Sequence, residues 1–433
     1  MSLATKMKSW WLSRKRLKQV LDQAVPLKPS YESPGREGDA ARQRRICMVA
    51  YATYESDNRV RRYAEALAKR GDKVDVISAG IPRADGRPIN INSVVVYHVY
   101  PKRQNESSHW TYAWESVRFL FISSRHLTRL HRRNRYDVIH IHNIPDFLVF
   151  AAWYPKATGA KVILDIHDAV PELFASKFDV ALKPAYIAIL RFVEKVSARL
   201  ADHVIIANDL WFETITTRSI PQERCSVFIN HVDPDLFAPR ARTRDDGRFI
   251  VLFPGSLQWH QGVDIAIRAF ALIRRRVPTA EFHIYSGGGN RERELRALVK
   301  DLSLDNSVYF FKSVSLDDIP QIIANADLGV VPKRADSFGN EAYSTKIMEF
   351  LSQGVPVVAS RTKVDSFYYE EGVIHFFEPG NYHAMAEAMT DVIFDRKLSD
   401  SLISRGYKYV ERNGWNCKRH EYLNLVDALA AGR

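Results

Sequence analysis

The sequence is poor in cysteine and has no long apolar run. Its three cysteines, Cys47, Cys225 and Cys417, are far apart and lack metal-ligand spacing, which predicts a chain that resides in reduced cytosol. No stretch of about 18 consecutive apolar residues occurs, so we expect no membrane-spanning helix. The N-terminus also lacks the continuous apolar core and small-residue cleavage site of a secretory signal peptide.

A further absence concerns the loop that follows the first predicted strand, residues 46–52. This loop reads YATYESDNRVRRYAEAL and has no G-x-G-x-x-G, which disfavours a dinucleotide-binding domain with its usual fingerprint. Asn58 and Arg59 stand at this strand-to-helix junction and are candidate ligand contacts. The alternative is that the residues at 57–59 only cap the helix.

The length and charge of the chain limit its organisation. At 433 residues, of which 46% are hydrophobic, two domains are expected. The formal net charge is +12, and residues 1–45 hold eleven Lys/Arg against four Asp/Glu. Because more than half of the excess lies in a terminal arm, the charge indicates a local electrostatic function, and we predict no nucleic-acid partner.

The sequence predicts a basic amphipathic arm at residues 1–25 and a linker at the proline- and glycine-containing residues 26–44. Trp10 and Trp11 form a pair in a stretch rich in lysine and arginine, as in helices that lie in the plane of a membrane interface. The pattern predicts contact with an anionic membrane surface through residues 6–25. A helix packed on the body of the protein and a disordered basic tail are the alternatives.

Beyond the linker, β-branched runs alternate with amphipathic helical segments. This alternation predicts parallel sheets covered by helices. The pattern restarts at residue 249, after a hinge at 234–248 that is rich in Pro, Arg and Asp. We therefore expect an α/β protein with two Rossmann-like domains facing across a cleft, an N-terminal domain at 45–238 and a C-terminal domain at 249–412.

The chain is organised around residues 334–360, which lie between two predicted buried strands, 328–331 and 355–359. Ser344 is expected to cap a helix between these strands. A loop carboxylate, Glu341, lies just before this cap. Groups placed outside the carboxyl end of a strand in an open α/β sheet are well situated to bind ligands.

Thr345, Lys346 and Glu349 share one side of the predicted helix, because positions three and four apart stack. The helix N-terminus and the lysine together suit a phosphate. Glu349, one turn further on, suits vicinal hydroxyls such as those of a ribose. The alternative is that Lys346 and Glu349 form an ordinary surface pair.

His167, Asp168 and Glu172 follow another predicted buried strand, a favoured position for chemistry. A capping and core role is the alternative for a lone histidine. His140 and His142 point to one face of a neighbouring strand, a pattern that can bind a metal in hydrolases. No additional regular ligand cluster accompanies them, so we predict no metal or other cofactor.

The segment 341–358 resembles retaining glycosyltransferases of family 4. Glu341 and Glu349 are separated by seven residues, and GVPVV follows at 354–358, as in that family. The similarity covers roughly residues 45–430. It implies the GT-B fold, with a C-terminal helix at 415–433 that crosses back to the first domain. The loop DIHDAVPELF is also similar to members that build bacterial surface polysaccharides.

The resemblance implies roles for individual residues. His167 would orient a hydroxyl of the donor sugar, and Glu341 would contact the sugar or stabilise charge at its anomeric carbon. The expected donor-binding residues are Glu349, Lys346, Thr345, Ser344, Gly255, Ser256, Gln261, Asn58 and Arg59.

One loop departs from the family pattern. Members commonly place an arginine and a lysine after the first strand of the second domain to grip the donor diphosphate. Ser256 and Gln261 occupy the corresponding positions here, which removes two positive charges. We expect Lys346 and the helix N-terminus, with nearby Arg59 or Arg334, to supply the missing charge.

The sequence thus predicts a metal-independent retaining glycosyltransferase that uses a nucleotide-sugar donor. Its acceptor would be a glycan or lipid-linked glycan in polysaccharide biosynthesis, on the cytoplasmic face of the membrane. Three alternatives remain: a sugar-nucleotide epimerase of the same fold, a metal-dependent hydrolase built on His140 and His142, and a non-catalytic scaffold that binds sugar nucleotides.

Overall fold

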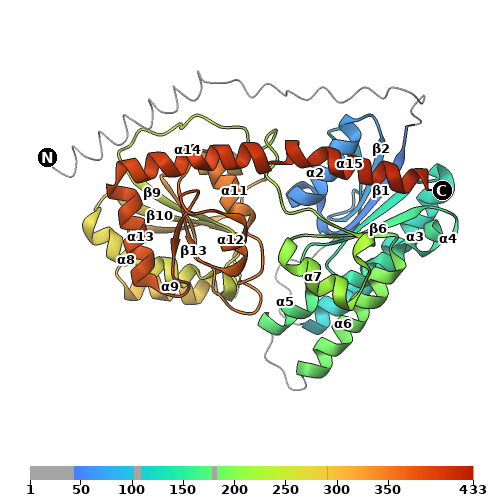
Figure 1. Ribbon diagram of the computed structural model, residues 1–433, viewed down its shortest axis with the longest axis horizontal. Helices are drawn as coiled ribbons and strands as arrows, with labels where there is room; N and C mark the ends of the chain where they lie inside the picture. The colour runs from blue at the N-terminus through green and yellow to red at the C-terminus, as the bar shows by residue number, and fades with distance from the viewer. Residues whose placement is uncertain (1–42, 102–108, 178–182, 290, 433) are drawn as a thin grey trace.

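The computed structural model describes residues 43–101, 109–177, 183–289 and 291–432, which form two α/β domains (Figure 1). The predicted basic arm and all but the end of the linker lie outside the described residues. Among the helices that are described, none combines the length and the apolarity needed to cross a bilayer.

The first domain contains, within the described residues, an eight-stranded sheet in the order β3-β4-β2-β1-β5-β6-β7-β8. All neighbours pair in parallel except β3 with β4. The strands are β1 (Arg45–Thr53), β2 (Lys73–Ala79), β3 (Ile89–Ile91), β4 (Val94–Tyr100), β5 (Val138–His142), β6 (Lys161–Ile166), β7 (His203–Ile206) and β8 (Cys225–Val227). The helical segments are η1 (Tyr54–Ser56), α2 (Asn58–Lys69), α3 (His109–Asn134), η2 (Asp146–Ala152), α4 (Trp153–Ala157), α5 (Val170–Lys177), α6 (Lys183–Leu200), α7 (Asp209–Arg218) and η3 (Gln222–Arg224).

The second domain contains a parallel sheet in the order β11-β10-β9-β12-β13-β14. Its strands are β9 (Phe249–Pro254), β10 (Ala280–Ser286), β11 (Val308–Lys312), β12 (Leu328–Val331), β13 (Val357–Ser360) and β14 (His375–Phe377). Its helical segments are η4 (Trp259–Gln261), α8 (Val263–Arg276), α9 (Glu292–Asp301), α10 (Ile319–Ala324), α11 (Thr345–Ser352), α12 (Lys363–Tyr368), α13 (Tyr382–Phe394) and α14 (Arg396–Asn413).

Local sequence signals place the ends of the elements. α2 begins after Asp57, whose side chain accepts hydrogen bonds from the backbone N–H groups of Arg59 and Val60. Gly71, with φ +98°, follows the end of α2, as expected for a residue that leaves a helix in a left-handed conformation. The two-domain α/β fold predicted from the alternation is confirmed, and β3 and β4 extend the first sheet beyond the strands that the sequence predicted.

Each face of the first sheet is covered by a different set of helices. One core contains side chains of α3, η2, α6 and α7 packed on the sheet. The core on the opposite face contains side chains of α2 and of the last helix, α15 (Trp415–Ala431). The sheet is therefore buried on both faces, as its continuous apolar strands predict.

The C-terminal helix crosses back to the first domain, as predicted. α14 and α15 follow each other along one side of both domains (Figure 1). Trp415 and Tyr422 of α15 pack on Tyr63 of α2, with ring centroids 5.4 and 4.2 Å from that of Tyr63. The Tyr422 hydroxyl is also 3.0 Å from Nδ1 of His140 in β5. Buried aromatic side chains thus fasten the end of the chain to the first sheet.

His231 lies where the chain leaves the first domain, and its Nδ1 is 2.7 Å from the carbonyl oxygen of Asn413 at the end of α14. Burial, reinforced by the neighbouring Arg62 guanidinium, lowers the pKa of His231 to about 3. His231 is therefore protonated as the pH falls below about 6.5 in the unfolded chain, whereas in the folded chain it stays neutral until about pH 3. The contribution of neutral His231 to the free energy of unfolding is fully present above pH 6.5 and is lost progressively as the pH falls from 6.5 toward 3.

We expect the His231→Asn variant to show a weaker loss of stability in acid, because asparagine keeps a donor for Asn413 and cannot be protonated. Between pH 7 and pH 5 the wild type should lose about 2 kcal/mol more free energy of unfolding than the variant does. Urea titrations at the two pH values measure this difference. Equal losses of free energy of unfolding in the wild type and in the variant would contradict the lowered pKa of His231.

Candidate functional site

Two cavities lie where the carboxyl ends of the two sheets face each other. The smaller has a volume of about 270 Å³ and the larger a volume of about 360 Å³. The smaller is lined by Ile144, Asp168, Leu173, Ser256, Gln258, His260, Gln261, Lys333, Phe338, Ala342, Tyr343, Ser344, Thr345 and Lys346. The larger is lined by Ala52, Thr53, Ser56, Asp57, Asn58, Arg59, Arg62, His167, Asn230, Thr345 and Glu349. Thr345, the first residue of α11, lines both cavities.

The N-terminus of α11 forms one wall of this cleft. Ser344 occupies the position before the helix, as predicted, but its hydroxyl makes no capping hydrogen bond. This hydroxyl is buried and has no hydrogen-bond partner among the described residues, and Ser344 lines the smaller cavity. The capping prediction was wrong in this respect. A helix N-terminus with an unpartnered hydroxyl beside it suits an anion.

Lys346 is held between α11 and the loop after β9. Its Nζ donates to Oε1 of Gln261 at 3.0 Å and lies 5.5 Å from the centroid of the Phe253 ring. A Cβ atom on Gly255 would come within 2.4 Å of Lys346 Cε, so this loop needs a glycine where the lysine passes. Burial lowers the pKa of Lys346 to about 8, although Glu349 opposes the shift.

Gln261 links Lys346 to a histidine on the same loop. Its Nε2 lies 3.0 Å from Nε2 of His260, so the amide places a polar bridge between the two side chains. Gln261 and Ser256 both line the smaller cavity, where they offer hydrogen bonds but no charge. At the two loop positions where cations were expected, the wall of the smaller cavity therefore carries neutral polar side chains.

Lys333 supplies a cation that the sequence interpretation missed. It lies two residues after the end of β12 and lines the smaller cavity. Its Nζ donates to the carbonyl oxygen of Ala342 at 2.7 Å and is 2.8 Å from Oδ2 of Asp365. Its place after a buried strand was the available sequence signal, because such positions open toward the cleft.

Glu349 faces the larger cavity from the second turn of α11. Burial raises the pKa of its carboxyl group, while Lys346 and a hydrogen bond from Thr345 act in the opposite direction. The structure therefore brings Thr345, Lys346 and Glu349 together at the junction of the two cavities, with the lysine toward the smaller cavity and the carboxylate toward the larger.

The first domain closes the larger cavity with Asn58, Arg59 and His167, together with Arg62 and Asn230, which the sequence interpretation did not single out. Arg62 stands only three residues after Arg59 in the same helix, whereas Asn230 lies far from the predicted motifs. Arg62 is a buried residue on a helix face, and Asn230 follows a short strand, so neither gave a distinct sequence signal.

Arg59 has most of its hydrogen-bonding capacity engaged inside the protein. Its guanidinium contacts both oxygens of Asp165, at 2.7 and 2.8 Å. It also donates to the carbonyl oxygen of Phe228 at 2.7 Å and to Oδ1 of Asn230 at 3.0 Å. Arg334 is likewise bound, because it pairs with Asp264 and lines neither cavity of the described structure. Neither arginine is free to replace the missing loop cations.

His167 belongs to a polar cluster around Asp165. Its Nε2 lies 3.2 Å from Oδ2 of Asp165 and 3.1 Å from Nδ1 of His142. The Arg59 guanidinium and the histidines hold the pKa of Asp165 well below its usual range, against the effect of burial. Burial lowers the pKa of both His140 and His142. The carboxylate thus fixes the ring of His167 at the cavity wall.

Potential ligand atoms of His140, His142 and Asp165 lie within 4.8 Å of one another, close enough for a metal ion. Both oxygens of Asp165 already accept hydrogen bonds from the guanidinium of Arg59, whose charge opposes a metal cation. We therefore interpret this cluster as a hydrogen-bonded support for His167.

Two predicted acidic residues point elsewhere. Glu341 pairs with Nζ of Lys363 at 2.9 Å and is absent from the described lining of both cavities, although its neighbours Ala342 and Tyr343 line the smaller one. Glu172 lies in α5 and binds Arg218 at 2.7 Å. Asp168, in contrast, reaches the smaller cavity.

Comparisons with known proteins match both halves of the chain. The family model described as "Glycosyl transferase 4-like domain" matches residues 56–231, and "Glycosyl transferases group 1" matches residues 237–409. An uncharacterised glycosyltransferase of Methanocaldococcus jannaschii is 24% identical over 386 residues, which cover 84% of this chain and 91% of that protein.

Two solved structures are similar to the whole described body. Sucrose-phosphate synthase from Thermosynechococcus elongatus has a TM-score of 0.74 at 18% identity, covering 90% of this chain and 100% of that chain. Anabaena HepE, solved in complex with UDP and glucose, has a TM-score of 0.65 at 17% identity, with coverages of 90% and 100%. At these identities the likeness shows a shared fold, the two-domain GT-B arrangement.

Replacing Asp165 by asparagine tests the support of the cleft. The shape is kept, but the Arg59 guanidinium is left buried without its counter-charge, so we expect a loss of about 3 to 5 kcal/mol in the free energy of unfolding. Urea titration measures the loss. The matched control is Asp235→Asn, which breaks an exposed pair with Lys69 and should cost less than about 1 kcal/mol. Equal losses of free energy of unfolding in Asp165→Asn and Asp235→Asn would refute the role of Asp165 as a buried support of the cleft.

Proposed function

The chain belongs to family 4 of the glycosyltransferases, and we propose that it transfers a sugar, with retention of anomeric configuration, from a nucleotide-diphosphate sugar to a glycan or lipid-linked glycan. The observation that carries this proposal is the first two turns of α11. They present a helix N-terminus, a buried lysine and a carboxylate at the junction of two cavities between the domains. The HepE structure, with UDP and glucose bound at the same fold, supports a nucleotide-sugar donor.

The donor would bind mainly to the second domain. Glu349 would accept hydrogen bonds from the two hydroxyls of the ribose, and Lys346 would face the diphosphate. The backbone amides at the start of α11 and the free hydroxyl of Ser344 would add donors to the phosphate oxygens. Charge-assisted hydrogen bonds of this kind are about twice as strong as neutral ones.

Ser256 and Gln261 leave the loop after β9 without the two cations expected there, so other residues must supply positive charge. The leaving diphosphate needs positive charge in a largely water-free cleft. Lys333 and Lys346 line the same cavity, but the Asp365 carboxylate 2.8 Å from Lys333 Nζ offsets the charge of Lys333, so Lys346 would be the main cation where the leaving group forms. Ser256 and Gln261 would then supply hydrogen bonds to the same oxygens. This arrangement disfavours the non-catalytic scaffold, which was suggested by the missing loop cations.

The acceptor step would combine groups from both domains. His167, held by Asp165, would orient a hydroxyl of the donor sugar. The departing diphosphate would itself take the acceptor proton, so the reaction depends on charge placement and domain closure more than on a protein nucleophile. Glu341 would reach the sugar only after its pair with Lys363 opens.

The proposed transfer, the epimerase and the hydrolase differ in whether they need an acceptor and whether a chelator stops them. An epimerase would convert the donor without any acceptor. A hydrolase built on the His140 and His142 pair would lose activity with a chelator, whereas the proposed transfer proceeds with chelator present. Product analysis with and without acceptor, in chelator, therefore distinguishes the three reactions.

The donor site is tested by a thermal-shift screen with UDP, GDP, ADP and their common sugars, in the presence of chelator. One nucleotide family should stabilise the wild type. In Glu349→Gln, which loses the charge at unchanged volume, the affinity for that nucleotide should fall about thirtyfold, because a hydrogen bond to a charged group contributes about 2 kcal/mol. Glu371→Gln, at an exposed carboxylate of the same domain, is the control. Wild-type affinity in Glu349→Gln would exclude the ribose assignment.

The pH dependence of nucleotide binding tests Lys346. Its pKa of about 8 means that it is cationic below pH 8 and neutral above, so its contribution is present below pH 8 and lost as the pH rises. The affinity for the diphosphate should be constant from pH 6.5 to 7.5 and should weaken between pH 8 and 9.5. Lys346→Met should bind weakly and without this dependence, as measured by titration calorimetry. A profile in the variant that matches the wild type would contradict the role.

A further inference from the structure

The helices on one face of the first sheet present a continuous outer surface. The strands that these helices cover are neighbours in the sheet order. α3 and α6 both pack against η2, which therefore lies between them, and α4 follows η2 directly. Side chains of α3, η2 and α6 share one core beneath this layer. The sides of α3, α4 and α6 that face away from the sheet thus point in the same general direction.

This surface exposes large apolar side chains that a folded protein normally buries. Five of them leave more than half of their surface open to solvent, and together they define what we call the apolar–basic face: Trp114 (64%) and Phe121 (68%) of α3, Trp153 (58%) of α4, and Ile189 (59%) and Phe192 (68%) of α6. Such residues scattered singly need no explanation, but five on adjoining elements indicate an interaction surface.

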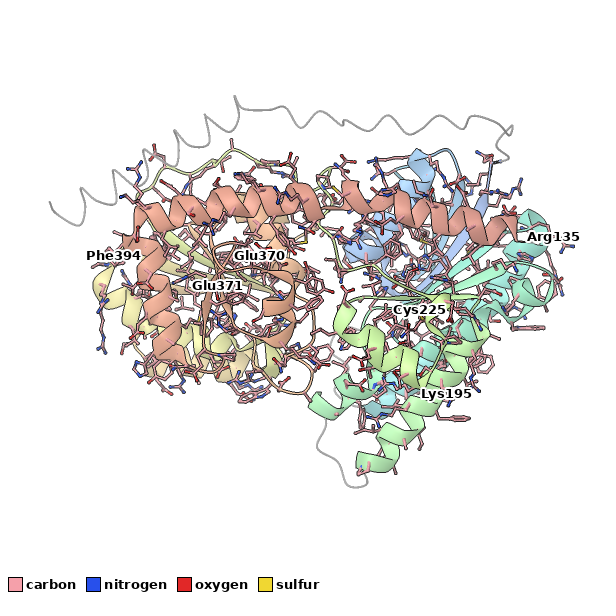
Figure 2. The ribbon with its side chains drawn as sticks, in the orientation of Figure 1. Arg135, Lys195, Cys225, Glu370, Glu371 and Phe394 are labelled. Carbon is pink, nitrogen blue, oxygen red and sulfur yellow. The ribbon has the colours of Figure 1, made fainter. Side chains whose placement is uncertain are left out.

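The charge of the same face has one sign. Its exposed cations are Arg118, Arg125 and Arg129 of α3 and Arg191, Lys195 and Arg199 of α6. Lys195, on α6, is labelled in Figure 2. The acidic residues of these two helices are Glu115 and Glu194, which are only 7% and 1% exposed. Glu194 is held inside by Arg218. Within their described residues, α3 and α6 therefore expose cations but no acidic side chain. Two of these cations lie at the edge of ion-pair distance from a carboxylate, Arg118 at 3.9 Å from Glu115 and Arg191 at 4.0 Å from Glu172 of α5.

We propose that the apolar–basic face docks on the surface of an anionic phospholipid bilayer. Tryptophan and phenylalanine would enter the boundary between headgroups and acyl chains, while the arginines and lysines would contact lipid phosphates. Each cation near an anionic leaflet contributes attraction, and the effect is screened by salt. A second copy of the chain fits the face poorly, because a two-fold interface would bring like charges together.

The position of the face relates it to the cleft. α6 packs against α5, and α5 begins three residues after His167. Docking through α6 would therefore bring the bilayer to the domain that carries His167. This inference goes beyond the proposed transfer reaction and stands apart from it, because lipid binding is measured without donor, acceptor or turnover.

The test is co-sedimentation of the full chain with vesicles of phosphatidylcholine alone or mixed with phosphatidylglycerol. Because the basic arm at 6–25 is predicted to bind the same lipids, all variants are made in a full chain in which the five cations Lys6, Lys8, Lys15, Arg16 and Lys18 are replaced by glutamine. In this background Lys195→Glu with Arg199→Glu should weaken binding to anionic vesicles about tenfold or more. Ile189→Ser with Phe192→Ser should also weaken it.

The matched controls reverse two exposed charges and remove one apolar side chain on the second domain. They are Arg275→Glu with Arg276→Glu at the end of α8, and Phe394→Ser in α13. Both should bind as the background protein does, and binding of that protein should decline with salt and be weak on phosphatidylcholine alone. Unchanged binding in both α6 variants, or an equal loss in the controls, would overturn the proposal. So would a concentration-dependent dimer that the α6 variants abolish.

Discussion

The buried ion pair between Asp165 and Arg59 determines how the first domain faces the cleft. It joins the end of β6 to the first turn of α2, and the same guanidinium reaches Phe228 and Asn230 beyond β8. Segments far apart in the sequence are thereby fixed at one point. Removing one partner of a buried pair leaves an uncompensated charge, so these segments hold their positions together. The orientation of His167 follows, since its ring rests on the same carboxylate.

The second domain is built differently at the cleft. Its polar groups come from one helix and the loop beside it, and they meet because Gly255 lets Lys346 pass and Gln261 receives it. Little of this arrangement depends on the other domain. Opening the cleft would therefore leave Lys346 and Gln261 in place, while it would break the contacts of Asn208 with Glu341 and of Asp209 with Tyr368 that join the domains. Such an arrangement suits a reaction in which a bound donor is covered by the opposite domain.

This difference decides what could be predicted from the sequence. The two-domain α/β fold and the side shared by Thr345, Lys346 and Glu349 depend on local periodicity and were predicted from it, whereas the crossing helix was predicted from the family resemblance. The partners of Arg59 are more than 100 residues away, so its engagement within the first domain could not be read from a junction motif. Lys333 was missed because a single lysine after a strand is not distinctive until the opposite wall of the cavity is known.

The two connections between the domains meet at one place. The backbone N–H of Trp415 donates to the carbonyl oxygen of Val232 at 3.0 Å, and His231 contacts Asn413 beside it. The outgoing linker and the returning helix thus run through a common pivot. Within the described chain, a swing of one domain about this pivot would change the width of the mouth between the domains and would separate Phe338 and Ala342 from the core of the first domain. Gly414 lies between α14 and α15 at this junction, so a small angular change there would be converted by the length of each domain into a large displacement at the rim.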